Sequence, residues 1–76
     1  MPRHYSTTEV ETVLRALGFE MIRQRGSDRR WRGVWGGQRR NVTVVAGQRQ
    51  IPDGTLRSIA TQAGLALDEL KKRIEG

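Results

Sequence analysis

The segment RQRGSDRRWRG, residues 23–33, carries the side chains of this sequence that are best suited to chemistry. It combines five arginines, a Gly-Ser pair, a tryptophan and a single acid, Asp28. Arginine binds phosphate oxygens through two parallel hydrogen bonds and stacks on nucleic-acid bases. The segment therefore predicts a surface for a polyanion, with nucleic acid as the leading interpretation and a solubility role as the alternative.

The net charge of +6 is concentrated in one central block of the chain. Residues 23–40 contain seven arginines and one acid, whereas the other 58 residues carry seven basic and seven acidic side chains. The whole excess of positive charge thus belongs to this block.

Other kinds of site are poorly supported by the sequence. It contains no cysteine, one histidine and no cluster of carboxylates, so we expect no metal ion, disulfide or cofactor. A serine nucleophile would need a histidine partner. The one histidine, His4, precedes the first predicted helix, and we expect it to be inert. The stretch GVWGG, residues 33–37, is predicted to be a turn and not a phosphate-binding loop.

The composition is that of one small globular domain. With 36% hydrophobic and 29% charged residues, a chain of 76 residues can form a single apolar core. We predict one domain over residues 1–76, with residues 1–5 as a flexible tail. Because no apolar stretch approaches ~20 residues and no apolar signal segment is present, we expect a cytoplasmic protein without a membrane partner.

A first helix is predicted after the tail. Ser6 and Glu9 form a capping box at its start, and Gly18 is suited to its end. Apolar side chains recur at helical spacing between these signals, at Val10, Val13, Leu14 and Leu17.

Three short strands are predicted between residues 19 and 45. They correspond to the runs FEMIRQRG, RRWRGVW and RNVTVV, separated by a Gly-Ser turn and by GGQ, a flexible connection. Trp31 and Trp35 share one face of the middle strand, opposite two arginines. We predict both tryptophans in the core, and one of them at the edge of the basic surface is the alternative.

The final third of the chain returns to helical spacing. A second helix is predicted with Asp53 or Thr55 as its cap and Gly64 as its end, followed by a short C-terminal helix in residues 65–76. The order is α-β-β-β-α plus the short helix, an α+β fold. Helices covering one face of the sheet would leave the arginine-rich face open. This is the layout of double-stranded-RNA-binding domains.

Two stretches resemble the HicA family, toxins of bacterial toxin–antitoxin pairs. GTLRSIATQAGLALDEL, residues 54–70, resembles the signature helix of the family, and LGFEMIRQRGS, residues 17–27, contains its Gly-Ser turn. The resemblance extends from about Ser6 to Ile74. It implies a fold similar to the double-stranded-RNA-binding domain and metal-independent cleavage of messenger RNA. It also implies a catalytic histidine directly after the Gly-Ser turn, where this chain has Asp28.

The resemblance also implies partners, and the concentration of positive charge indicates binding residues. The expected partners are messenger RNA and a HicB-like antitoxin protein. The sequence does not fix the oligomeric state, and we expect a monomer when the chain is free. We assign the catalytic position to Asp28. The residues that we predict to bind RNA are Arg23, Arg25, Gly26, Ser27, Arg29, Arg30, Arg39 and Arg40. A non-catalytic RNA-binding module and a basic domain that docks an acidic protein are the alternatives.

Asp28 departs from the family at the position that matters most for cleavage. Cleavage without a metal needs a group that takes a proton from the ribose 2′-hydroxyl and one that protonates the leaving oxygen. A histidine with a pKa near 6.5 can do either, whereas the ordinary pKa of aspartate is about 3.9 and neighbouring arginines favour its anion.

Three interpretations of this residue stay open. The chain is a natural variant that binds RNA but has lost most cleavage, or it carries a deliberate inactivating substitution, or Asp28 is a working base because burial raises its proton affinity. All three are compatible with an aspartate that closes the turn at Ser27.

Overall fold

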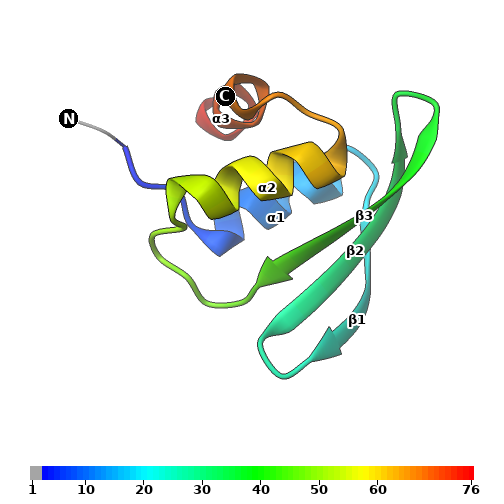
Figure 1. Cartoon of the computed structure of the whole chain (residues 1–76), viewed down its shortest axis with the longest axis horizontal. Coiled ribbons are helices and arrows are strands. Elements are labelled where there is room, and N and C mark those ends of the chain that lie inside the picture. The colour runs from blue at the N-terminus through cyan, green and yellow to red at the C-terminus, as the bar shows by residue number, and fades with distance from the viewer. Residues whose placement is uncertain (1–2) are drawn as a thin grey trace.

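The structure, a computed structural model, describes residues 3–76, and its elements follow the predicted order (Figure 1). They are α1 (Thr7–Ala16), β1 (Glu20–Arg25), β2 (Asp28–Trp35), β3 (Gln38–Val45), α2 (Asp53–Ala63) and α3 (Leu67–Glu75). The strands form one antiparallel sheet in the order β1-β2-β3. This confirms the predicted α+β fold, which has the layout of a double-stranded-RNA-binding domain with an added C-terminal helix.

Helix α1 begins at the predicted capping box. Ser6 Oγ accepts a hydrogen bond from the backbone N–H of Glu9 at 3.2 Å, and Glu9 Oε1 accepts one from the backbone N–H of Ser6 at 3.1 Å. Two free donors at the helix N-terminus are thereby satisfied. Gly18 follows the last turn with a φ of +94°, a conformation that favours glycine, and ends the helix as predicted.

The turn between β2 and β3 is tighter than predicted. Gly36 and Gly37 have φ values of +63° and +77°, as a two-residue type I′ turn requires. The prediction of a flexible GGQ connection is therefore wrong, because Gln38 already belongs to β3 and pairs with Trp35.

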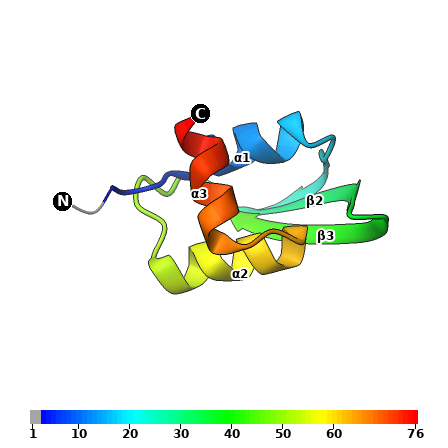
Figure 2. The same ribbon diagram turned by 90° about the horizontal axis from the view of Figure 1, so that it is seen from above.

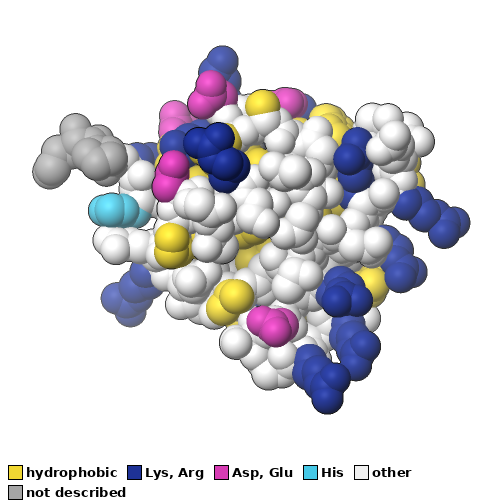
Figure 3. Space-filling view, viewed as in Figure 1, with side chains coloured by type: hydrophobic (Ala, Val, Ile, Leu, Met, Phe, Trp, Pro, Cys, Tyr) yellow, Lys and Arg dark blue, Asp and Glu magenta, His cyan; other side chains and the backbone are white. Residues whose placement is uncertain are grey.

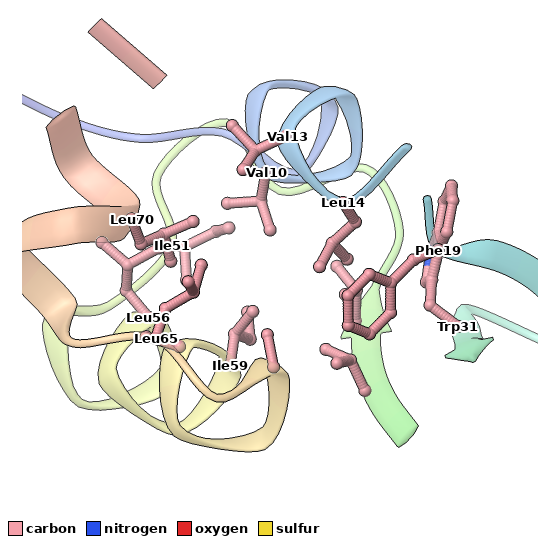
Figure 4. Packing of buried hydrophobic residues seen from close by; sticks show 14 of the residues in the cluster. Val10, Val13, Leu14, Phe19, Trp31, Ile51, Leu56, Ile59, Leu65 and Leu70 are labelled. Carbon is pink, nitrogen blue, oxygen red and sulfur yellow. The ribbon is translucent and has the colours of Figure 1, made fainter. Parts of the chain in front are cut away.

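The core is formed by buried side chains of the three helices and the strands, which Figure 2 shows from above. Figure 4 shows Val10 and Leu14 of α1 and Ile59 of α2 in the space between the two helices, with Phe19 and Trp31 on the side of the strands. Trp31 is only 2% exposed. Trp35 is half-buried on the same side of β2, with the guanidinium carbon of Arg73 5.1 Å from its ring centroid. Both tryptophans therefore pack with the core, as predicted, and neither lies at the edge of the basic surface.

Helix α2 begins without the predicted side-chain cap. Pro52 is the N-cap residue, and neither Asp53 nor Thr55 provides a capping hydrogen bond, so this part of the prediction is wrong. Both residues already lie inside the helix, and their side chains therefore cannot take the N-cap position. The predicted end of α2 is confirmed, because Gly64 follows its last residue with a φ of +84°.

The predicted N-terminal tail needs a correction at Tyr5. Its side chain is buried, its carbonyl accepts a hydrogen bond from the N–H of Ile51 at 2.8 Å, and its hydroxyl donates to the carboxylate of Glu75 in α3. The hydrogen bond to Glu75 raises the pKa of the Tyr5 hydroxyl. The rest of the tail prediction falls partly on residues 1 and 2, which lie outside the described residues.

Candidate nucleic-acid interface

The sheet face opposite the helices carries four rows of cross-strand neighbours. From the Gly-Ser turn outward, the rows are Arg25–Asp28–Val45, Arg23–Arg30–Thr43, Glu20–Arg32–Asn41 and Val34–Arg39. Figure 3 shows many Lys and Arg side chains along the side of the molecule that the strands form. We call this surface the basic face, and its arginines are Arg23, Arg25, Arg30, Arg32 and Arg39.

A β-bulge in β1 decides which arginines belong to this face. Side chains alternate along a regular strand, so Arg23 would share the face of Met21, which pairs with the buried Trp31. The register shifts between Met21 and Arg23, and Ile22 has no partner in β2. The extra residue reverses the alternation, and Arg23 therefore lies opposite Arg30 on the open face.

The turn end of the basic face is hollowed. Arg23, Arg25, Asp28, Arg30 and Thr43 line a shallow hollow of about 160 Å³. The three arginines are exposed, and none of them makes an ion pair with another group in residues 3–76. Two of the three face each other directly, and like charges in that arrangement repel. The hollow thus contains three arginines without an ion-pair partner in this part of the chain. An anion bound there would reduce the repulsion between them.

Asp28 is the acid in this hollow, and its side chain is exposed. A base activated by burial would have to be enclosed by the protein, and Asp28 is not. The interpretation of Asp28 as a base activated by burial is therefore wrong. Its carboxylate also accepts no hydrogen bond from the described part of the chain, so it does not close the turn at Ser27.

The turn itself borders the hollow. Gly26 and Ser27 connect Arg25 to Asp28, and Gly26 has a φ of +60°, which a two-residue hairpin turn needs at its first position. Ser27 also anchors the third strand, because its carbonyl accepts a hydrogen bond from the N–H of Ala46 at 2.7 Å.

Arg29 lies on the helix side of the sheet and not on the basic face. Its Nη1 donates to Glu11 Oε1 at 2.6 Å, and Glu11 Oε2 accepts a hydrogen bond from Trp31 Nε1 at 3.0 Å. Glu11 is only 5% exposed, and these two donors satisfy its buried carboxylate. Arg29 therefore holds β2 against α1.

Arg40 also points to the helix side. Its Nε donates to the carbonyl oxygen of Trp35 at 3.2 Å. Its guanidinium carbon lies 2.7 Å from the position that a Cβ on Gly64 would occupy, directly beneath the end of α2. The contacts of Arg29 and Arg40 separate both residues from the other predicted binding residues.

Arg39 is on the basic face but lies farther from the hollow. It is four residues from Thr43 in β3, which corresponds to about 13 Å along the strand. The prediction omitted Arg32 and Thr43, although both lie on this face. Strict alternation from Trp31 would have identified Arg32, because it points the same way as Arg30.

Metal-binding clusters and membrane-spanning helices are absent from residues 3–76. This part of the chain contains no group of three or more His, Asp or Glu side chains that could hold a metal ion. None of its helices is long and apolar enough to cross a membrane. His4 lines a second hollow, which Pro52 and Asp53 at the start of α2 also line, and is not among the residues that line the hollow at Asp28.

The order of elements and the open sheet face define a small α+β domain with the layout of a double-stranded-RNA-binding domain. Residues 7–65 match the family described as HicA toxin of bacterial toxin–antitoxin. The chain therefore belongs to the HicA toxin family, which implies an antitoxin partner and RNA as the general class of target. No curated protein and no solved structure matches the chain.

Proposed function

We propose that this chain binds messenger RNA through its basic face and that its cleavage of RNA is much reduced by the presence of Asp28. The observation that carries the proposal is the unpaired cluster of Arg23, Arg25 and Arg30 around the hollow. A phosphate bridging two facing arginines would replace their repulsion with two charge-assisted interactions. Arg32 and Arg39 extend the same charge along the sheet, as a polymeric anion requires.

The expected weakness in cleavage follows from the chemistry of the exposed carboxylate. Asp28 occupies the position of the family's catalytic histidine. It is adjacent to the arginines that would stabilise a negatively charged transition state. Electrostatic stabilisation would thus be retained. General acid–base catalysis contributes about 10²–10⁴-fold, and an exposed aspartate cannot supply the acid at neutral pH.

We expect Asp28→His to restore cleavage. Purified wild-type chain, Asp28→His and Asp28→Asn are incubated with a messenger RNA transcript, and the products are separated by electrophoresis. Asp28→His should cleave up to about 10²–10⁴-fold faster than the wild-type chain, because imidazole can take and give a proton near neutral pH.

Asp28→Asn is the matched control, because it removes the same negative charge without supplying a base. If the asparagine variant gains as much activity as the histidine variant, the gain is due to charge and not to proton transfer. If neither variant cleaves faster than the wild-type chain, the catalytic assignment of position 28 is wrong.

A non-catalytic RNA-binding module is the second candidate. The exposed Asp28, in a hollow without a histidine, favours it over an active nuclease. It predicts that all three proteins bind the transcript and that none of them cleaves it.

A further inference from the structure

The two edges of the sheet differ, and the edge formed by β3 is covered. Gln62 Oε1 in α2 accepts a hydrogen bond from the N–H of Thr43 at 2.9 Å. Thr7 Oγ1 in α1 donates to the carbonyl of Val45 at 2.7 Å. Side chains from both helices therefore form hydrogen bonds with the backbone groups of β3 that point away from β2. A strand from another molecule would have to displace them.

The edge formed by β1 is open. All six of its residues are exposed, and β2 is its main neighbour (Figure 1). No backbone group of β1 makes a hydrogen bond outside the sheet within residues 3–76. An open strand edge is a template for the addition of another strand, with main-chain hydrogen bonds providing affinity.

The register identifies Gln24 as a residue whose backbone points outward at this edge. Ser27, the residue just before β2, accepts a hydrogen bond from the N–H of Ala46, just after β3. The backbone groups of Ser27 therefore point toward β3. Bonding direction alternates along an antiparallel strand, so Asp28 bonds toward β1 and Arg29 toward β3. Gln24 pairs with Arg29, and its own N–H and C=O therefore point away from β2.

The side chains around the edge specify what an added strand should carry. Met21 is 46% exposed and Ile22 is 42% exposed, so apolar surface is uncovered there. On the basic face, Arg23 and Arg25 would lie beside the new strand and would interact with the side chains directly opposite them. Because side chains alternate, the complementary strand has acids at every second position and apolar residues between them.

A second copy of this chain fits the edge poorly. Pairing two β1 strands would join two basic faces into one surface, and each copy carries a net charge of +6. The strand is also short and interrupted by the bulge at Ile22, two features that oppose indiscriminate pairing. Such an edge favours a partner of opposite charge.

We propose that the antitoxin partner adds an extended segment to the β1 edge, with alternating acidic and apolar side chains. The proposal rests on membership in the toxin family and not on RNA binding. The acids would lie beside Arg23 and Arg25, and the apolar residues would cover Met21. The partner's main chain would bond to Gln24.

The test uses a synthetic peptide of alternating glutamate and valine and a scrambled peptide with its glutamates grouped at one end. Binding to the full chain is measured by calorimetry, and amide hydrogen exchange is followed by NMR with and without peptide. We expect the alternating peptide to bind at least roughly tenfold more tightly than the scrambled one. It should also slow exchange of the Gln24 amide.

Gln24→Pro removes the outward N–H without removing a hydrogen bond to β2, as an edge position permits. Relative to Gln24→Ala, it should weaken binding of the alternating peptide roughly tenfold, the loss expected for an unmade main-chain hydrogen bond. Binding of RNA should be unchanged in Gln24→Pro, so failure of this proposal is separable from failure of RNA binding.

Several results would overturn the proposal. Equal binding of the two peptides would mean that charge alone attracts them. Exchange protection confined to α1 or α2 would place the partner elsewhere, and this readout on the wild-type chain decides the matter if Gln24→Pro does not fold. A dimer of the free chain that Gln24→Pro disrupts would assign the edge to a second copy.

Discussion

Arg29 and Arg30 are adjacent in the sequence but have opposite surroundings. Arg29 pairs with the buried carboxylate of Glu11 on the helix side, whereas Arg30 lies on the basic face opposite Arg23. The same residue type therefore supports the fold in one case and is available to a ligand in the other. At this scale the chemistry of a side chain depends on the face of the strand that it occupies.

Substituting each of these arginines by glutamine should separate stability from RNA binding. Arg29→Gln removes the charged partner of the buried Glu11, whose hydrogen bond from Trp31 remains, and should lower the free energy of unfolding by about 1–3 kcal/mol. Arg30→Gln should change stability by no more than about 0.5 kcal/mol but weaken RNA binding. Urea denaturation and RNA titration of both variants check this, and reversed effects would show that the two faces have been assigned wrongly.

At the scale of the elements, the bulge in β1 and the approach of Phe19 to β2 shape the sheet. The bulge brings Arg23 and Arg25 to the basic face. On the helix side, a Cβ on Gly33 would lie 2.6–2.9 Å from ring atoms of Phe19, which is 2% exposed. The absence of a side chain at Gly33 thus allows the ring to pack directly on the strand.

Gly33→Ala should therefore destabilise the chain. The added methyl group overlaps a buried ring that is enclosed by the core, and overpacking of this kind typically costs about 1–3 kcal/mol. Gly54→Ala is the matched control, because a Cβ there meets nothing within 4 Å and alanine favours the helix. We expect Gly54→Ala to be neutral or stabilising by up to about 1 kcal/mol. Equal midpoints of urea denaturation for the two variants would contradict the proposed contact.

At the scale of the whole molecule, charge is distributed unevenly between the two sides of the sheet. Five arginines lie on the basic face, while the residues outside the central block have no net charge. A polyanion is therefore attracted most strongly to the strand side of the molecule. The hollow at Asp28 lies at one end of that surface.

Salt dependence should report how many of these arginines contact RNA. For five phosphate contacts to single-stranded RNA, the logarithm of the association constant should fall with the logarithm of salt concentration with a slope of about −3.5. Arg32→Gln should reduce the slope by about 0.7. Arg57→Gln, which removes an exposed charge on α2, should leave it unchanged. Equal reductions by both variants would mean that only the net charge matters.

The elements could be predicted because their signals are local. The capping box at Ser6, the glycine that ends each of the first two helices, and the alternation around Trp31 all depend on neighbours within a few residues. Two local details were wrong, the flexible GGQ connection and the side-chain cap of α2, whereas the prediction for the N-terminal tail was wrong because a distant contact decides the outcome. Tyr5 is ordered by Ile51 and Glu75, which are remote in sequence and gave no local signal.

The candidate site was only partly predictable for the same reason. Composition located the positive charge in residues 23–40 but could not assign it to a face. Arg29 and Arg40 were predicted to bind RNA, and each is held by a contact on the helix side. Arg32 was omitted although it lies on the basic face.

By itself, the sequence determined the kind of domain, its family and the sign of its surface charge, because local spacing and composition encode these directly. The tertiary structure alone decided which arginines share a surface with Asp28, that Asp28 is exposed, and which edge of the sheet is open. These features depend on one unpaired residue in β1 and on contacts between remote segments. A single bulge moves every residue on one side of it to the opposite face of the sheet. No local pattern in the sequence of β1 indicated this bulge.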